Sequence, residues 1–439
     1  MKKLFLTPIA MAISIIASFP AHADELSDLK TQIQSLSERL ANIEKERARP
    51  APAATTPAQS AQTDQPTPVT IAYPPSMQLL SGDNTLSLYG IVDMTFATQS
   101  NANAAGKRGS APVVSWMSGN RFGINASHVL DKQSGLGIIA RLENEFELPT
   151  GNLDTNNVLF NRDAWIGLQS DDLGKITFGR QNTLPRDFAQ TWGEAFGSRE
   201  VGLDEGGWNN NNQMQYMINY AGGANGTRYN SAVVWKKKSG AWVTGLAHQF
   251  NGAGSIVAGD ITTGTSSAAA LAYNGGKWNV NGTYSTANVA GYAHKVAGLG
   301  GNVEVTPGIV LRGGYFNNRT DQAVVGQRKD DVLTTSITFM PASMSRYQFD
   351  LGYYNIHAKN AGYAASGNTL GVNSDTSAVT TAADGKMSTF YAAAFYRWDR
   401  QADAYIALDK VNTDGGFKYG FTNGFHTATE LGVGLRYKF

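Results

Sequence analysis

The chain has no cysteine among its 439 residues. That absence excludes disulfide frameworks, Cys-ligated zinc, iron–sulfur clusters and thiol catalysis. Charged residues are scarce, at 16% against about 25% in soluble domains. After residue 23 there is no run of about 20 apolar residues, the length that a membrane-spanning helix needs. The formal net charge is only +1, so the composition does not favour a nucleic-acid partner.

Glycine and aromatic residues are plentiful, with 48 Gly, 18 Tyr and 19 Phe, and the mean hydropathy is -0.27. This combination is typical of a transmembrane β-barrel, because the apolar residues of its membrane face alternate with polar ones along each strand.

The first residues form an export signal. Lys2 and Lys3 precede an apolar stretch from Leu4 to Phe19, and Ala21-His22-Ala23 follows as a small-x-small cleavage pattern. We therefore predict a signal peptide over residues 1–23, and a retained membrane anchor is the alternative.

Residues 24–48 carry a heptad pattern. Charged and amide residues separate the apolar positions Leu26, Leu29, Ile33, Leu36, Leu40 and Ile43. The pattern predicts a short periplasmic coiled-coil helix, with a single amphipathic helix on a surface as the alternative. Residues 49–84 follow as a linker, because Arg49 to Pro75 contains seven prolines among Ala, Thr and Gln and cannot build a core.

Residues 85–439 change to segments of about ten residues with period two, separated by Gly, Asn, Asp and Pro clusters. We predict an all-β transmembrane barrel of sixteen antiparallel strands. The predicted strands are 86–96, 120–130, 136–148, 160–170, 174–181, 228–236, 241–250, 267–275, 278–287, 294–304, 308–317, 331–340, 345–357, 387–398, 402–411 and 427–439. Gln213 to Tyr220 is a further candidate, so eighteen strands is the alternative.

Charged residues fix which face of a strand points inward. Arg312 alternates with Leu311 on one strand, and the opposite register would place its guanidinium in hydrocarbon at about 2–4 kcal/mol. By the same rule Arg346, Gln348 and Asp350 are predicted to face the lumen.

The last strand ends the chain on an aromatic residue. Its apolar face consists of Leu431, Val433, Leu435, Tyr437 and Phe439. This pattern resembles the signal that the outer-membrane barrel assembly machinery reads. The alternative is the last strand of a soluble β-protein.

Several motifs resemble the Gram-negative trimeric porins of the general-diffusion type. They are Leu88-Tyr89-Gly90-Ile91-Val92-Asp93, Ser118-Gly119-Asn120-Arg121-Phe122-Gly123, Arg141-Leu142-Glu143, Leu159 to Leu168 (LFNRDAWIGL) and Leu173 to Gln181 (LGKITFGRQ). The resemblance implies an outer-membrane homotrimer, surrounded by lipid and lipopolysaccharide, that admits small hydrophilic solutes. The N-terminal coil and linker are similar in architecture to the DcaP-like porins, which implies uptake of small anions such as dicarboxylates.

The segment 182–225 is the candidate constriction loop, because it is much longer than an ordinary connection. The sequence leaves open whether it folds into the lumen. Its acids are Asp187, Glu194, Glu200, Asp204 and Glu205, and it also carries Arg186 and Arg199. The porin resemblance implies lumen-facing Arg121 and Arg162 on the opposite wall, with Arg180 at the base of the loop. Acids facing arginines across a narrow opening create a transverse field that orients polar solutes. The alternative is that these charges are solvated loop residues or wall salt bridges.

The sequence also bears on two other classes of function, an enzyme and a structural tether. An enzyme is not expected, because the histidines of the mature chain (His128, His248, His294, His357 and His426) are scattered and belong to no catalytic cluster. No metal site and no cofactor is predicted either. A structural tether, with the coil reaching toward the cell wall, is the alternative function. An acid-rich loop favours cations whereas the DcaP-like resemblance favours anions, so selectivity stays open.

Overall fold

The computed structural model describes residues 77–113, 117–192, 197–204, 226–251 and 264–439. The predicted signal peptide and coiled-coil helix lie outside the described residues, as do most of the predicted linker and Gln213 to Tyr220. No helix in the described part of the chain is long and apolar enough to span a membrane.

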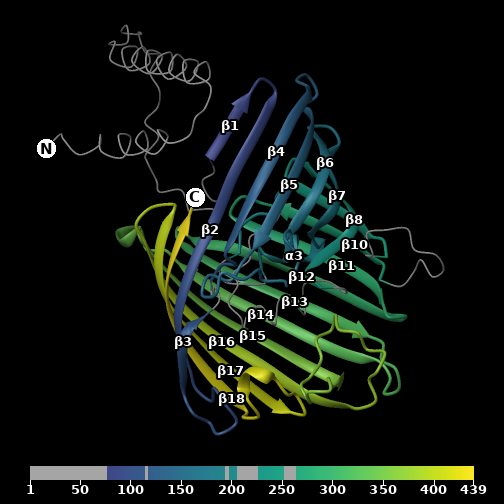
Figure 1. The fold of residues 1–439 in the computed structure, drawn as a ribbon, viewed down its shortest axis with the longest axis vertical. Helices are drawn as coiled ribbons and strands as arrows, with labels where there is room; N and C mark the ends of the chain where they lie inside the picture. Colours follow the sequence, from purple (N-terminus) through teal and green to yellow (C-terminus); the bar gives the residue numbers. More distant parts are fainter. Residues whose placement is uncertain (1–76, 114–116, 193–196, 205–225, 252–263) are drawn as a thin grey trace, which may run out of the picture. The chain divides into compact units, whose positions relative to one another are not determined.

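Sixteen antiparallel strands form a closed barrel (Figure 1), as the alternating segments predicted. Each strand pairs with the next, and the last pairs with the first. The barrel strands are β2 (Asn84–Gln99), β4 (Arg121–Asp131), β5 (Leu136–Glu145), β6 (Asp163–Ser170), β7 (Gly174–Asn182), β8 (Arg228–Ser239), β9 (Trp242–Gln249), β10 (Ser266–Asn274), β11 (Trp278–Val289), β12 (Tyr292–Thr306), β13 (Ile309–Thr320), β14 (Arg328–Phe339), β15 (Tyr347–Gly362), β16 (Ala382–Arg397), β17 (Ala402–Gly415) and β18 (Thr427–Lys438).

Two short strands add to this ring without becoming part of it. β1 (Met77–Ser81) and β3 (Gly109–Val113) both pair with β2. β1 lies within the range 49–84 that was expected to be linker. It pairs with Asn84 to Leu88, whereas β18 pairs with β2 only from Ile91 onward. The hairpin therefore continues the sheet past the end of β18.

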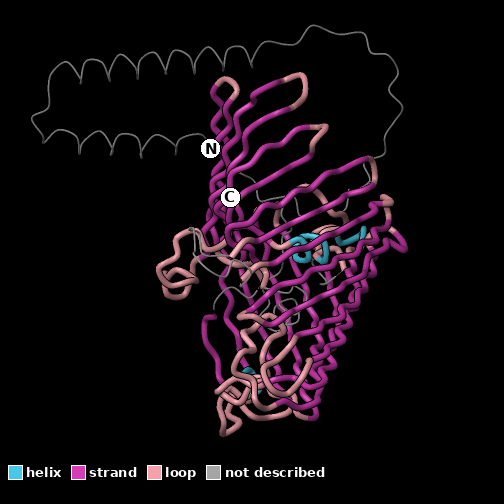
Figure 2. Tube along the Cα trace, turned by 90° about the vertical axis from the view of Figure 1, so that its right-hand side faces the viewer, coloured by secondary structure: helices cyan, strands magenta, loops and turns pink. Residues whose placement is uncertain are grey.

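The two ends of the barrel differ in the length of their connections. One end, the turn end, has short turns such as 132–135, 171–173 and 307–308. The other, the loop end, mostly has longer connections such as 146–162 and 363–381. The strands are tilted, so neighbouring hairpins at the turn end are staggered (Figure 2). Two 3₁₀ helices, η2 (Ala342–Met344) and η3 (Gly420–Thr422), lie in connections.

The alternation along the strands separates an outer apolar face from an inner one, as β13 illustrates. Leu311 and Tyr315 are exposed on the outside, while Arg312 is buried inside. On β15, Gln348 and Asp350 face inward as predicted. The prediction that Arg346 faces the lumen is wrong. It lies in the turn before β15, is exposed, and donates a 3.1 Å hydrogen bond to the hydroxyl of Tyr396.

The end of the chain closes the ring. Leu431, Val433, Leu435 and Tyr437 are exposed on the outer face of β18. The backbone of Phe439 makes two hydrogen bonds with Gly90, at 2.9 and 3.0 Å. The ring of Phe439 covers Gly90 so closely that a Cβ atom there would overlap it. The terminal aromatic residue thus packs on the first barrel strand.

An inward-facing side chain near the end of β18 also ties this strand to its neighbours. Arg436 makes a buried pair with Asp403 of β17 at 2.9 Å and donates a 2.8 Å hydrogen bond to Ser118. The backbone N–H of Ser118 donates in turn to Asp93 of β2 at 2.7 Å. These contacts join β18 to β17 on one side and, through Ser118, to β2 on the other side, where the barrel closes.

Candidate pore constriction

The segment after β7 begins with the only α-helix in the described residues, α3 (Leu184–Ala189). Thr183 caps it by accepting a hydrogen bond from the backbone N–H of Arg186, and Pro185 occupies the first turn, where its missing N–H costs nothing. Every residue of α3 is buried. The helix lies within the outline of the barrel in the ribbon of Figure 1 and in the tube of Figure 2.

An apolar core inside the barrel holds the helix. Leu184, Phe188 and Val201 of the segment pack with small residues on the inner faces of three strands, namely Ala232 and Val234 of β8, Val243 and Ala247 of β9, and Ala268, Ala270 and Ala272 of β10. A Cβ atom at Gly245 of β9 would lie 2.9 Å from the Leu184 side chain. Burying a Leu or Phe side chain contributes about 1.5–3 kcal/mol. This part of the wall is therefore dry, in contrast to the wet lumen that the alternation suggested.

Trp192 anchors the segment farther along the wall. Its ring is fully buried and packs against Phe316, with centroids 4.4 Å apart. A Cβ atom at either Gly300 of β12 or Gly314 of β13 would overlap the indole. The indole N–H donates to Asn281 at 2.7 Å, and the backbone carbonyl of Trp192 accepts from Thr334 at 3.0 Å. Two glycines thus form a slot for one large side chain.

Residues 197–204 continue along the inner face. Arg199 pairs with Glu304 at 2.9 Å, and Arg312 donates to the Gly197 carbonyl at 3.0 Å. The described parts of the candidate constriction loop therefore lie inside the barrel. For these residues, the structure answers whether the loop folds into the lumen, which the sequence leaves open.

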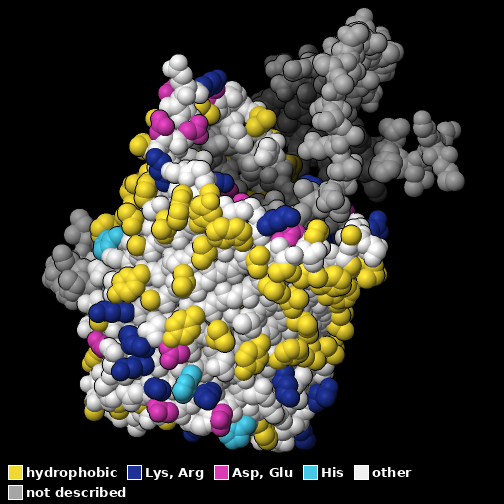
Figure 3. Space-filling model, turned by 180° about the vertical axis from the view of Figure 1, so that it is seen from behind, with side chains coloured by type: hydrophobic (Ala, Val, Ile, Leu, Met, Phe, Trp, Pro, Cys, Tyr) yellow, Lys and Arg dark blue, Asp and Glu magenta, His cyan; other side chains and the backbone are white. Residues whose placement is uncertain are grey.

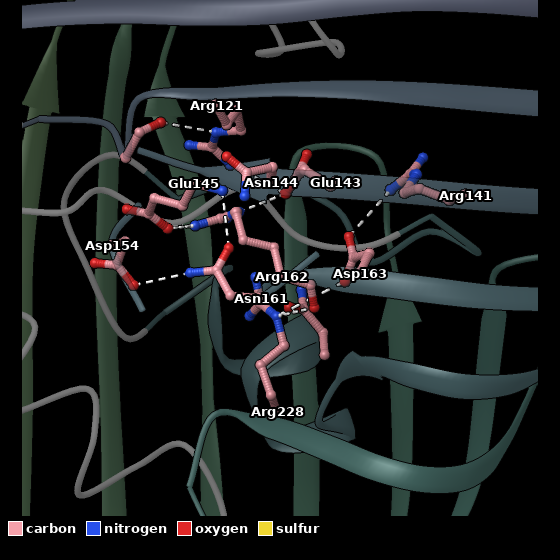
Figure 4. Close-up of polar contacts among 12 residues, drawn as sticks. Arg121, Arg141, Glu143, Asn144, Glu145, Asp154, Asn161, Arg162, Asp163 and Arg228 are labelled. Atoms are coloured by element: carbon pink, nitrogen blue, oxygen red, sulfur yellow. Dashed lines mark hydrogen bonds and ion pairs between the residues drawn. The ribbon is translucent and has the colours of Figure 1, made fainter. Parts of the chain in front are cut away.

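A cluster of buried charges faces this loop from β4, β5 and the start of β6 (Figure 4), and we call it the arginine cluster. Arg162 is bound between Glu143 and Glu145. Arg121 lies 4.0 Å from Glu143 and donates to the Gly119 carbonyl at 2.9 Å. Tyr89 of β2 donates to Glu143 at 2.8 Å.

A second set of pairs extends the arginine cluster toward β8. Asp163 lies 3.9 Å from Arg141 and 3.7 Å from Arg228. Arg228 also donates to the Arg162 carbonyl at 2.8 Å. The register explains the grouping, because Arg121 is paired with Glu145, and Glu143 with Asp163, on neighbouring strands.

Arg186 brings the loop to the arginine cluster. Burial lowers the pKa of its guanidinium well below the usual range, and the positive charges of Arg228 and Arg162 add to that shift. The cluster consists of Arg121, Arg141, Arg162, Arg186 and Arg228 with the carboxylates of Glu143, Glu145, Asp154 and Asp163. The cluster therefore contains five guanidinium groups and four carboxylates, an excess of one positive group.

The predicted loop acids occupy other places. Asp187 pairs with Lys236 of β8 at 2.9 Å, and Asp204 lies 3.9 Å from Lys175 of β7. Glu200 is exposed. Glu194 and Glu205 lie outside the described residues. Asp187 and Asp204 therefore pair with lysines of the barrel wall and not with arginines, because the loop folds back on β7 and β8.

Arg180 also differs from its expected place. It is paired with Ala164, whereas the neighbouring Gly179 is paired with the inward Trp165, so Arg180 faces the other side of the sheet. Its guanidinium donates to the Asn161 carbonyl at 2.6 Å and to the side chain of Asn230. Its charge still acts on Arg228 and Asp163 of the arginine cluster, although its guanidinium lies on the other side of the sheet.

Sequence reasoning missed Glu145, Arg228, Lys175 and Lys236. The signal for Glu145 was present, because Arg141, Glu143 and Glu145 recur at a spacing of two and so share one face. The pairing of Arg228 with Asp163 carries no such signal. Among the described residues, no group of three His, Cys, Asp or Glu side chains is placed to hold a metal ion.

A closed barrel that is apolar outside, with a charged cluster and an inserted loop inside, defines a membrane channel of the β-barrel class. The chain belongs to the Gram-negative porin family, whose model matches residues 50–416. It is therefore an outer-membrane protein.

A curated relative is an outer membrane porin protein of Bordetella pertussis, 28% identical over 206 residues. That match covers 45% of this chain and 49% of the relative, so the chain spans about half the length of the curated relative it matches.

Solved structures share the fold. An anion-selective porin from Comamonas acidovorans superposes with a TM-score of 0.61 at 18% identity, covering 81% of this chain and 100% of that one. The outer membrane channel DcaP of Acinetobacter baumannii gives a TM-score of 0.53 at 12% identity, covering 82% and 99%. The chain is thus similar in fold to DcaP, as its N-terminal architecture suggested.

Proposed function

We propose that this porin forms a channel for passive diffusion and that the channel favours small anions, including dicarboxylates, over cations. The observation that carries the proposal is the excess of guanidinium groups in the arginine cluster, together with the engagement of Asp187 and Asp204 by lysines. Loop acids that are held by wall lysines repel a passing anion less than free carboxylates would. The Comamonas porin of the same fold is described as anion-selective, which agrees with this proposal without carrying it.

We further propose that an anion would be held between the loop and the wall. Arg186 approaches the cluster from the loop, whereas Arg121 and Arg162 belong to the wall. An anion between them would be drawn to guanidinium groups on two sides, and its charge would relieve the repulsion between Arg186 and Arg228. Two such contacts suit a solute that carries two carboxylates.

The reversal potential in planar bilayers under a salt gradient tests the proposal. We expect an anion preference in the natural channel and a shift toward cations when Arg121→Ala and Arg162→Ala are combined. The matched control is Arg400→Ala, because Arg400 is exposed in the turn 398–401 at the other end of the barrel. A cation preference in the natural channel would refute the proposal. An equal shift in the Arg400→Ala variant would remove the arginine cluster as its cause.

Because Arg162 neutralises two buried glutamates, folding must be verified separately. Heat-dependent gel mobility of the barrel serves that purpose, and Arg121→Gln alone is the milder variant, with a smaller shift expected.

We also propose that the channel is a homotrimer. A solved structure that shares the fold at a TM-score of 0.54, OmpT of Vibrio cholerae, is described as a trimer form, which supports this proposal. Chemical crosslinking in detergent, followed by mass measurement, should give three copies. The structural tether gains no support from the comparisons, and residues 24–48, on which it rests, lie outside the described part of the chain. The absence of enzymatic activity stays a prediction.

A further inference from the structure

Part of the connection between β15 and β16 lies inside the barrel at the loop end. It consists of residues 370–376, and we call it the mouth strap. Thr320 of β13 and Arg328 of β14 are inward-facing, buried and paired with each other across the strands. The Thr320 hydroxyl donates to the Val372 carbonyl at 3.2 Å, and the Arg328 guanidinium donates to the Leu370 carbonyl. Because inward-facing side chains hold the mouth strap, it lies on the lumen side of the wall.

Neighbouring connections anchor the mouth strap at both of its ends. Just before it, the backbone N–H of Thr369 donates to the Lys418 carbonyl at 2.8 Å, and the Thr369 hydroxyl accepts from the Lys418 N–H at 2.9 Å. At its far end, the Thr376 hydroxyl donates to the Asp321 carbonyl at 2.7 Å, and the Thr376 carbonyl accepts from the backbone N–H of Ala323 at 3.3 Å. The strap is therefore tied between the β17–β18 connection and the β13–β14 connection.

The middle of the mouth strap reaches the segment that leads into β8. A Cβ atom at Gly226 would lie 3.6 Å from the side-chain nitrogen of Asn373. In the ring of strands, β9, β10, β11 and β12 separate β8 from β13, from which Thr320 holds the strap. The strap and the start of β8 therefore meet across the opening of the barrel.

The mouth strap lies on the outer side of the arginine cluster. The chain enters β8 from the loop end, so Gly226 lies farther out than Arg228, which belongs to the cluster. Figure 3 shows that charged side chains replace the apolar ones of the outer surface near its lower end, which is the loop end. Long connections face outward in outer-membrane barrels. A solute that enters from outside therefore meets the mouth strap before the arginine cluster.

The chemistry of the mouth strap differs from that of the arginine cluster. Within the connection 363–381, Asp375 is the only charged residue. It is exposed, and its carboxylate accepts from the backbone N–H of Ser377 at 2.8 Å. Asn373 and Ser374 are half-buried, so part of their polar surface is accessible. The strap thus presents amide and hydroxyl groups, which can replace the hydration water of a polar solute whatever its charge.

We propose that the mouth strap is a second, uncharged filter, which limits the size of the solutes that reach the arginine cluster, and that Asn373 sets its width. Solute size is then selected at the strap and solute charge at the cluster. The strap keeps a constant position because its backbone is bound on both sides, to Lys418 and to Ala323. This filter is independent of the proposed preference for anions.

A single introduced thiol tests whether Asn373 lines the path of the solute. The chain has no cysteine, so Asn373→Cys carries the only reactive thiol. Ser366→Cys is the matched control, because Ser366 is exposed in the same connection before the strap. A bulky, uncharged methanethiosulfonate is added on the loop side of channels in planar bilayers, and complete labelling is verified by mass. We expect the label at residue 373 to lower the single-channel conductance about twofold, and the label at residue 366 to leave it unchanged.

Loosening the anchors tests whether the strap limits size. Thr320→Val combined with Thr376→Val keeps the shape of both side chains and removes two hydrogen bonds to the backbone. Thr380→Val, at an exposed threonine of the same connection, is the matched control. Liposome swelling with uncharged sugars of increasing size should show faster entry of the larger sugars through the double variant only. Its reversal potential should equal that of the natural channel, and heat-dependent gel mobility verifies that each variant is folded.

Three outcomes would overturn the proposal. Fully labelled Asn373→Cys channels with unchanged conductance would place residue 373 outside the path. Equal entry of large sugars through the natural channel and a folded double variant would show that the strap does not limit size. A shift in reversal potential as large as that from Arg121→Ala with Arg162→Ala would show that the strap acts on charge. Because the label and the sugars are uncharged, the first two readouts do not depend on which ions the natural channel prefers.

Discussion

The indole ring of Trp192 lies where Gly314 has no side chain, and a Cβ atom at residue 314 would overlap it. The loop inside the barrel and the strand that faces it are therefore matched at a single position. Gly300 on the neighbouring strand completes the slot. This relationship fixes how closely Trp192 approaches the wall.

Adding one methyl group at Gly314 should displace the loop. Gly314→Ala forces the Trp192 ring out of its slot, and overpacking of this kind costs about 1–3 kcal/mol. We expect an altered single-channel conductance with more frequent closures in planar bilayers. Gly313→Ala is the matched control, because a Cβ atom there would have only the Thr334 carbonyl nearby, at 3.8 Å. Identical channels from both variants would show that the slot does not position the loop.

Removing the Arg162 guanidinium should destabilise the barrel. Arg162→Met leaves Glu143 and Glu145 buried beside each other without their main partner, at a cost of about 3–5 kcal/mol. The midpoint of urea unfolding, followed by gel mobility, measures the loss. Adding Glu145→Gln to the same chain should restore most of it, because Glu143 keeps Arg121 as a partner and the cluster keeps its original excess of one positive group. A stable Arg162→Met variant would contradict the pairing.

The contact between Gly90 and Phe439 should control closure of the ring. Gly90→Ala pushes the terminal ring away from β2, so we expect slower assembly into heat-resistant barrels in a refolding assay. Phe439→Ser should also slow assembly, because the ring no longer covers β2. Combining both changes should cost little more than either alone, since they remove one contact. Additive delays would indicate two separate roles.

Selectivity should depend on pH through Asp154, which lies in the connection 146–162. Burial raises the pKa of Asp154 above its ordinary value, and the negative charge of Glu145 adds to the rise. As the pH falls, Asp154 is neutralised before an ordinary aspartate, and the anion preference should increase. Asp154→Asn should show the stronger preference already at neutral pH, and its difference from the natural channel should vanish in acid. Reversal potentials measured against pH provide the check. Asp399→Asn, in a turn at the other end, should behave like the natural channel at every pH.

The positions of the barrel strands were predictable because the signal is local. All sixteen predicted segments correspond to strands, since alternation with period two records which side chains face lipid. Arg312 and Gln348 were placed on the correct face for the same reason. Arg180 was expected at the pore from the family pattern, although its own strand groups it with Ile176 and Phe178, which face outward.

The charge pairs inside the barrel were harder to predict. The loop acids were expected to face arginines, yet Asp187 pairs with Lys236, because α3 packs on the inner faces of β8, β9 and β10. Whether a carboxylate meets Arg or Lys depends on the direction of the loop after α3, and no spacing in the sequence records it. The apolar inner face of β10 did carry a signal in its alanines, but alanine suits either side of a strand.

The sequence by itself determined that the chain is a barrel, where its strands lie and which residues of most strands face outward, because the alternation of neighbouring residues carries each of these. It also determined the terminal strand that closes the ring. Only the tertiary structure decided that the loop lies inside, that Trp192 fits between Gly300 and Gly314, and that Arg162 joins two glutamates. These contacts link residues that are far apart in the chain, so they exist only once the ring has closed and set the distances across it.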